Sequence, residues 1–177
     1  MAVIFWFNCT VVDTETNLNY NLKNSLEADK LRIYLDNCCY NRPYDDQTQL
    51  KISLETQSKL YIQDCIKENK FQLAASYVLI FENAKNPYEG KKESILKFLE
   101  ENTDIFIDES YKDEVGNLAE KIMTTGIKTA DAHHIAAAIL AKCDFLITTD
   151  KRMLKFVSER IKIISPIDFI DLAGEKL

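Results

Sequence analysis

The stretch TADAHHIAAAILAKCDFLITTD (129–150) joins an apolar helical pattern to a short β-leaning run that is followed by an acid. Residues 129–142 have the spacing of a helix, and DFLIT (144–148) is typical of a buried strand. Since only a tight turn separates the two, the helix must run antiparallel to the strand. The start of the helix and the end of the strand then meet at one edge, which brings Asp131 close to Asp150.

Similar apolar runs recur upstream and downstream, and helical patterns separate them. The predicted strands besides 144–148 are LRIYL (31–35), FQLAA (71–75), DIFI (104–107) and IKII (161–164). Helices are predicted between the first two strands and over 76–86, 89–101, 111–124 and 129–142. Strands that alternate with helices indicate the α/β class, with a parallel sheet covered by helices on both faces.

The helix between the first two predicted strands carries a second local pattern. Leu50, Leu54, Tyr61 and Cys65 keep helical spacing. Asp46 and Gln49 stand where a capping box would begin a helix. We therefore expect the helix to start near Asp46.

Four acids stand at the edges of these elements. Asp36 and Asp150 follow strands, whereas Glu82 and Asp131 are expected in the first turns of apolar helices. In this topology all four converge at the carboxyl edge of the sheet, where open α/β sheets place their ligand sites. Asp131 also shares a helix face with Ile135 and Ile139, so its side chain should lean toward the core.

A cluster of four carboxylates needs an explanation, because like charges repel. At ~5 Å and an effective dielectric constant of ~20, each pair costs roughly 3 kcal/mol. A cation would offset this repulsion, and carboxylate oxygens suit Mg²⁺ or Mn²⁺ and the phosphate chemistry those ions support. The sequence therefore predicts a metal site that contains all four acids. Taken singly, each acid could instead be a turn, cap or surface residue.

Over residues 31–170 the chain resembles the PIN-domain ribonucleases, a family that includes toxins of bacterial toxin–antitoxin pairs. The resemblance is carried by a hydrophobic residue before Asp36-Asn37, by Glu82, by Lys128-Thr129-Ala130-Asp131, and by Thr148-Thr149-Asp150. It implies a three-layer α/β/α fold with a five-stranded parallel sheet ordered 3-2-1-4-5. It also implies metal-dependent hydrolysis of RNA, with an antitoxin protein and a second copy of the chain as candidate partners.

The resemblance gives each acid a role. Asp36 and Asp150 would bind the metal directly, Asp131 would ligate it or hold a coordinated water, and Glu82 would complete the site. The chain departs from the commonest family pattern after the first acid, where Asn37-Cys38-Cys39 replaces Thr-Asn. This departure concerns the hydrogen bonds around the metal and leaves the acids in place.

Composition sets the outer bounds. The 177 residues, 46% of them hydrophobic, fit one nuclease domain over 31–177 and an extension of unknown role over 1–30. Five Cys without zinc-type spacing indicate reduced thiols and a cytoplasmic location. The apolar run AVIFWFNCTVV (2–12) is too short to span a bilayer and lacks the flanks of a secretory signal. The net charge of −6 opposes the binding of RNA, so RNA would need a local patch of basic residues or a bound metal ion.

Several residues near the acids remain open to two interpretations. His134 lies one helical turn beyond Asp131, and we interpret it as a core or boundary histidine rather than a substrate contact. Five cations flank the acids and either hold RNA phosphates or are ordinary surface charges: Arg42, Lys128, Lys151, Arg152 and Lys155.

Two other function classes also fit an α/β chain with acids at its sheet edge. A phospho-accepting receiver domain would need an acidic pair on an earlier strand, which Asp13 and Glu15 could imitate, and a Lys after the last strand, which IKIISP (161–166) lacks. A metal-independent RNA-binding protein on the same fold is the third class. Loss of one acid would favour it, yet all four acids are present.

Overall fold

The computed structural model describes residues 30–174, and its sheet has the predicted topology. Within these residues five strands form one sheet in the order β3-β2-β1-β4-β5, and every neighbouring pair is parallel. The α/β class and the strand order are therefore confirmed. The strands are β1 (Arg32–Leu35), β2 (Gln72–Ser76), β3 (Thr103–Ile107), β4 (Phe145–Ile147) and β5 (Lys162–Ile164).

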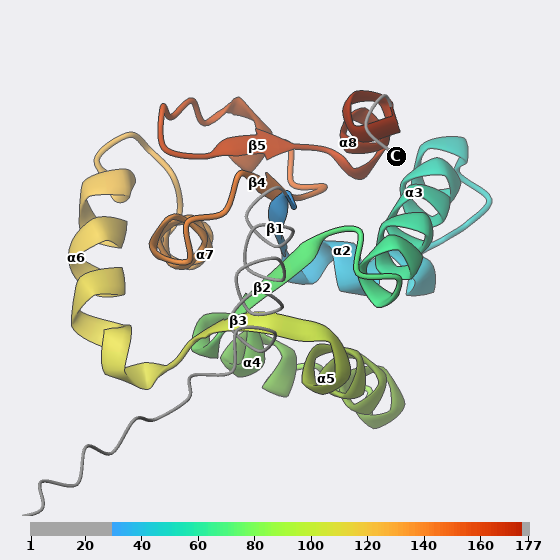
Figure 1. The fold of residues 1–177 in the computed structure, drawn as a ribbon, viewed down its shortest axis with the longest axis horizontal. Helices are drawn as coiled ribbons and strands as arrows, with labels where there is room; N and C mark the ends of the chain where they lie inside the picture. Colours follow the sequence, from blue (N-terminus) through green and yellow to red (C-terminus); the bar gives the residue numbers. More distant parts are fainter. Residues whose placement is uncertain (1–29, 175–177) are drawn as a thin grey trace, which may run out of the picture. The chain divides into compact units, whose positions relative to one another are not determined.

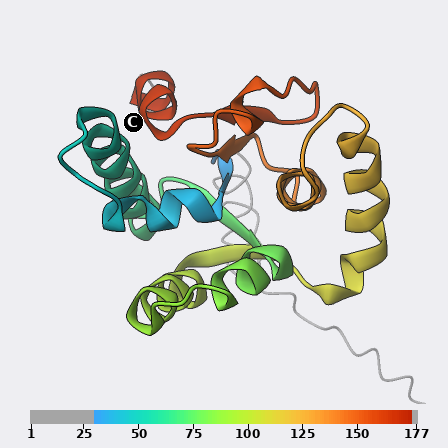
Figure 2. The same ribbon diagram turned by 180° about the vertical axis from the view of Figure 1, so that it is seen from behind.

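Helices cover both faces of this sheet, as Figure 1 and its reverse view in Figure 2 show. On one face α6 packs against α7, and on the other α3 packs against α8. The helices within 30–174 are α2 (Asn37–Asn41), α3 (Leu50–Lys67), α4 (Tyr77–Ala84), α5 (Glu89–Asn102), α6 (Lys112–Met123), α7 (Thr129–Leu140) and α8 (Pro166–Gly174). None of them has the length and apolar character required to cross a membrane.

The central strands form the core because each is buried on both sides. Ile33, Tyr34 and Leu35 of β1 have no exposed surface, and neither do Leu146 and Ile147 of β4. This is the continuous apolar pattern expected of a parallel sheet between two helix layers. The strand that carries Asp36 is therefore held rigidly by its neighbours.

Helix α3 forms where it was predicted, but its start and its buried face differ from the prediction. Gln49 is the N-cap residue and its side chain makes no cap hydrogen bond, so the capping box at Asp46 is wrong. Asp46 instead accepts hydrogen bonds from the backbone and hydroxyl of Thr48. Leu50 and Tyr61 are exposed by 74% and 45%, because a buried, largely polar face of α3 packs inward instead.

The turn between α7 and β4 fixes their antiparallel arrangement. Lys142 adopts a left-handed conformation (φ 55°) just after the helix. Its N–H donates to the carbonyl of Ile139, and the N–H of Cys143 donates to that of Ala138. This is a helix C-terminal motif that usually uses glycine. It reverses the chain within three residues, so the start of α7 lies beside the end of β4.

The two ends of the chain fall outside the described residues. The predicted extension 1–30 therefore has no structural description here, apart from Lys30 at its end. The acidic pair Asp13 and Glu15, on which the receiver alternative depends, also lies outside them. The residues from Leu31 onward form a compact unit of their own.

Candidate metal centre

Asp36 is the most firmly held acid of the site. It ends β1 and is the N-cap residue of α2, with its carboxylate accepting a 2.8 Å hydrogen bond from the N–H of Asn37. The thiol of Cys38 and the hydroxyl of Thr148 each donate to its other oxygen, both at 2.8 Å. Only 6% of the residue is exposed. Its side chain is therefore oriented before any ligand arrives.

The ends of β1 and β4 meet as predicted. The strands pair through Leu35 and Ile147, and the N–H of Asp36 donates to the carbonyl of Ile147. The chain then continues through Thr148 and Thr149 to Asp150. Since β1 leads to β2 on one side while β4 lies on the other, this is the switch point of the sheet.

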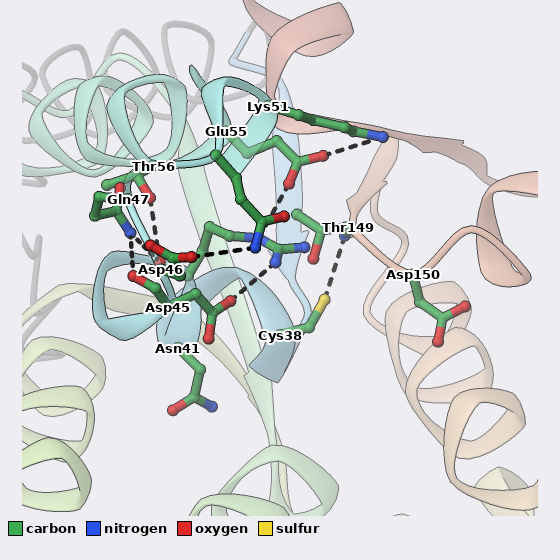
Figure 3. A network of polar contacts seen from close by, with 12 residues as sticks. Cys38, Asn41, Asp45, Asp46, Gln47, Lys51, Glu55, Thr56, Thr149 and Asp150 are labelled. Carbon is green, nitrogen blue, oxygen red and sulfur yellow. Dashed lines mark hydrogen bonds and ion pairs between the residues drawn. The ribbon is translucent and has the colours of Figure 1, made fainter. Parts of the chain in front are cut away.

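Cys38 lies two residues after Asp36 and connects it to the loop that follows β4. Its Sγ atom accepts a 3.2 Å hydrogen bond from the N–H of Thr149, drawn as a dashed line in Figure 3, and lies 3.2 Å from the hydroxyl of Thr148. The thiol thus links Asp36 to the loop that carries Asp150. The hydrogen bonds to the carboxylate of Asp36 are supplied by this thiol, by Thr148 and by the N–H of Asn37.

Glu82 reaches the site from a different position than predicted. Helix α4 ends at Ala84, so Glu82 lies in its last turn and the expectation of a first-turn position is wrong. The carboxylate lies 2.5 Å from Nε2 of His134, and its side chain is 42% exposed. The hydrogen bond and charge of His134 lower the pKa of Glu82, against the opposing effect of burial.

His134 is a core histidine, as interpreted, but it also faces the site. Its side chain is 2% exposed, and its Nδ1 atom lies 2.9 Å from the hydroxyl of Tyr34, which in turn lies 2.7 Å from the hydroxyl of Ser76. Burial lowers the pKa of His134, but the hydrogen bond to Glu82 and the nearby acids outweigh it, so the pKa is raised.

Among the described residues, Asp36, Glu82 and His134 form a group that could hold a metal ion. One ligand atom from each lies within 4.8 Å of the others. The sequence predicted two of these three residues. The third is His134. It lies three residues after Asp131 in the predicted helix, and this spacing places both side chains toward the same end of α7.

Asp131 and Asp150 lie outside that tight group but within electrostatic reach of it. Burial, followed by the charges of Asp150 and Asp36, raises the pKa of Asp131. Its Oδ2 atom is buried, and no group among the described residues hydrogen-bonds to it. Asp150 is turned toward Arg152, whose guanidinium lies 2.9 Å away and helps to lower the pKa of Asp150.

The donor set fits a divalent cation. A buried carboxylate oxygen without a partner is costly, and a cation at this position would satisfy it. It would also offset the repulsion that raises the pKa of Asp131. Oxygen donors from Asp36, Glu82 and Asp131 match the preference of Mg²⁺ and Mn²⁺.

Two of the five cations near the acids are already paired. Arg42 contacts the buried carboxylate of Glu55 at 3.0 Å and that of Asp45 at 2.9 Å, within the network drawn in Figure 3. Arg152 is paired with Asp150. The other three, Lys128, Lys151 and Lys155, are exposed.

A cleft of about 920 Å³ opens beside the site between α4, α6 and α7. Its wall includes Glu82 and His134, together with the aromatic residues Tyr77 and Phe81. Phe81 is 64% exposed, and the amino group of Lys85 lies 4.0 Å from the centre of its ring. The cleft thus places an aromatic surface beside Glu82, the one of the four acids that lines it.

Comparison with known proteins gives no family for the chain. No family model matches it, and no curated protein matches it significantly.

Proposed function

We propose that this chain is a metal-dependent ribonuclease of the PIN type, which hydrolyses phosphodiester bonds in RNA. The observation that carries the proposal is the buried Oδ2 atom of Asp131, which has no partner among the described residues and lies in the field of Asp36 and Asp150. The fold places these acids at the switch point of a sheet with the order 3-2-1-4-5. A cation is the ligand that this arrangement favours.

The residues of the site have distinct tasks. Asp36 is held by three hydrogen bonds and provides a fixed oxygen ligand. Asp131 provides a partly buried carboxylate, and the charges of Arg152 and His134 offset its repulsion from Asp150 and Asp36 only in part, because its pKa stays raised. Glu82 is oriented by His134 and is exposed enough to bind the ion or to orient the attacking water. The bound ion would lower the pKa of a water and offset charge that develops on the phosphate.

The surroundings of the site support a single-stranded RNA substrate. An aromatic ring next to Glu82 can stack on an unpaired base of any kind, because every base has a flat π face. Phe81 offers such a ring, and Lys85 adds a cation at its face. The exposed side chains of Lys128, Lys151 and Lys155 supply local positive charge in a chain with a net charge of −6.

We also propose the cellular setting that the PIN resemblance implies. The nuclease would act as a toxin, bind an antitoxin protein, and associate with a second copy of itself. Cys38, Cys39, Cys65 and Cys143 are free thiols, which supports a reducing compartment such as the cytoplasm.

The receiver alternative is disfavoured by topology. Receiver domains have the order 2-1-3-4-5, whereas the described sheet has 3-2-1-4-5. In addition, Glu82 and Asp131 lie on helices, where a receiver has no use for them.

A cleavage assay tests the proposal. The full chain should cut labelled single-stranded RNA with Mn²⁺, and EDTA should stop the reaction. Asp36→Asn and Asp150→Asn should each lower the rate by roughly 10²-fold or more, because each removes charge from one electrostatic cluster. Asp171→Asn, at an exposed position of α8, is the matched control.

Two outcomes would contradict the proposal. Wild-type rates in either folded site variant would remove these acids from the reaction. Stable phosphorylation of the chain by acetyl phosphate, with RNA left intact, would favour a receiver instead.

A further inference from the structure

The ring nitrogen of His134 that faces away from the site contacts a hydroxyl group, as is usual for histidines that bind metals. Histidines that bind metals usually donate their second ring N–H to an oxygen that fixes the ring. Here Nδ1 faces the hydroxyl of Tyr34 at 2.9 Å, while Nε2 faces Glu82 and the site. Tyr34 and Ser76 are fully buried, so the ring cannot turn without losing these contacts.

The two hydroxyls behind the ring can serve either tautomer. When Nε2 carries the proton and donates to Glu82, Ser76 donates to Tyr34 and Tyr34 donates to Nδ1. When Nδ1 carries the proton, the direction reverses, with Nδ1 donating to Tyr34 and Tyr34 donating to Ser76. In the second arrangement Nε2 presents a lone pair to the site, and a cation bound there would replace its hydrogen bond to Glu82.

We propose that His134 binds the metal through Nε2, together with Asp36 and Glu82, and that the centre therefore prefers Mn²⁺ to Mg²⁺. The three ligand atoms lie within 4.8 Å of one another. Imidazole nitrogen suits first-row transition ions, whereas Mg²⁺ favours oxygen ligands. The inference rests on the metal-dependent function proposed above, and it adds the identity of one ligand and the preferred ion.

A nitrogen ligand can be detected without any activity measurement. The chain contains two histidines, and the full chain loaded with Mn²⁺ should show ¹⁴N coupling to the ion in pulsed electron paramagnetic resonance. Incorporation of ¹⁵N-histidine should replace the ¹⁴N signal with a ¹⁵N signal. This experiment uses the unmodified sequence, so it does not depend on how any variant folds.

His133 and His134 form a matched pair for assignment. His133 is partly exposed, and its Nδ1 atom lies 2.7 Å from the carbonyl of Thr129 in its own helix. We expect His133→Gln to keep the coupling and His134→Gln to abolish it. His134→Gln should also weaken Mn²⁺ binding by about 10-fold or more and Mg²⁺ binding much less. Tyr34→Phe keeps the coupling and weakens Mn²⁺ binding by roughly 10-fold.

The outcomes separate this inference from the proposed function. RNA cleavage with Mn²⁺ bound but without histidine coupling would overturn the inference and leave the nuclease in place. Histidine coupling without RNA cleavage would support the inference and overturn the nuclease. Coupling that survives in His134→Gln, or is lost in His133→Gln, would overturn the assignment to His134. Failure of the chain to bind Mn²⁺ would overturn both.

Discussion

The hydroxyl of Thr148 donates a 2.8 Å hydrogen bond to the carboxylate of Asp36, which ties the loop after β4 to the end of β1. The side chain of Asp36 is thereby held in place by Thr148, together with Asn37 and Cys38. Among the described residues, no group donates a hydrogen bond to the buried Oδ2 atom of Asp131. The repulsive cost of the cluster therefore falls mainly on Asp131.

This asymmetry predicts that Asp131→Asn stabilises the metal-free protein, whereas Asp36→Asn does not. Burial and the nearby acids raise the pKa of Asp131 above its unfolded value, so its ionisation opposes folding at neutral pH. We expect the Tm of Asp131→Asn in EDTA to rise by roughly 1–3 °C, a small value because the group is partly exposed. Asp36→Asn should lower the Tm, because it weakens a helix cap.

The pH dependence gives the sign of the effect. The advantage of Asp131→Asn should be present above the folded-state pKa of Asp131 and shrink as the pH falls through it toward 3.8. Well below pH 3.8 the advantage should vanish, because the wild-type carboxyl is then protonated in both states. Mn²⁺ should reverse the order of the two melting temperatures, since only the wild type gains the full binding energy. An Asp131→Asn protein that melts below the wild type in EDTA at pH 7 would contradict this account.

A second prediction concerns Lys59 on α3, which is 5% exposed and lies over the ring of Tyr40. Burial lowers the pKa of Lys59 to about 8 from its ordinary value of 10.5. Below pH 8 the folded state therefore carries a buried charge at a cost of up to roughly 3 kcal/mol. Lys59→Met should raise the free energy of unfolding at pH 7 by about 1–3 kcal/mol, as measured by urea denaturation.

The gain from Lys59→Met should shrink as the pH rises from 8 toward 10.5, because the wild-type folded state loses its charged lysine before the unfolded chain does. Lys67→Met is the matched control on the same helix, at a largely exposed site paired with Asp64. It should change stability by no more than about 0.5 kcal/mol. A gain at Lys59 that does not depend on pH would point to better packing rather than to removal of the charge.

The thiol beside Asp36 predicts sensitivity to alkylation. Cys38 is partly exposed, whereas Cys39, Cys65 and Cys143 are buried, so Cys38 should react first among the described cysteines. In a Cys9→Ser background, N-ethylmaleimide should inactivate RNA cleavage as one adduct forms, because the added group displaces the contacts to Asp36 and Thr149. Mass spectrometry would locate the adduct.

Cys38→Ser is the control for that experiment, since a hydroxyl can also donate to Asp36. Its cleavage rate should be the same before and after treatment. Inactivation of Cys38→Ser at the wild-type rate would show that the reagent acts elsewhere.

The sheet could be predicted from the sequence, but several helical details could not. Five short apolar runs define the strands because buried parallel strands carry almost no polar residues. Helix α2 is only one turn long and depends on the cap at Asp36, so periodicity cannot reveal it. On α3 the face with Leu50 and Tyr61 is exposed, because pairing with Arg42 allows Glu55 to be buried instead.

The four acids were visible in the sequence because each stands at the edge of a strong pattern. The spacing from Asp131 places His134 near the site, but it does not reveal the contacts of its ring with Tyr34 on β1 and, through Tyr34, with Ser76 on β2. Their hydroxyls meet the ring only after β1 and β2 pair in register, with Tyr34 opposite Ala74. Contacts of this kind join residues that are far apart in the chain, so they cannot be predicted from the spacing of residues within one segment.

The last prediction concerns the aromatic wall of the cleft beside Glu82. If a base of the substrate stacks on Phe81, removal of the ring should weaken RNA binding by the stacking energy of about 1–2 kcal/mol, which is roughly 5- to 30-fold in KM. The turnover number kcat should change little, because the carboxylates remain in place. Steady-state cleavage of a short single-stranded RNA by Phe81→Ala measures both quantities. Leu50→Ala, which also removes an exposed apolar side chain but on α3, should leave KM unchanged. A Phe81→Ala protein with wild-type KM, or one that loses only kcat, would place the substrate base elsewhere.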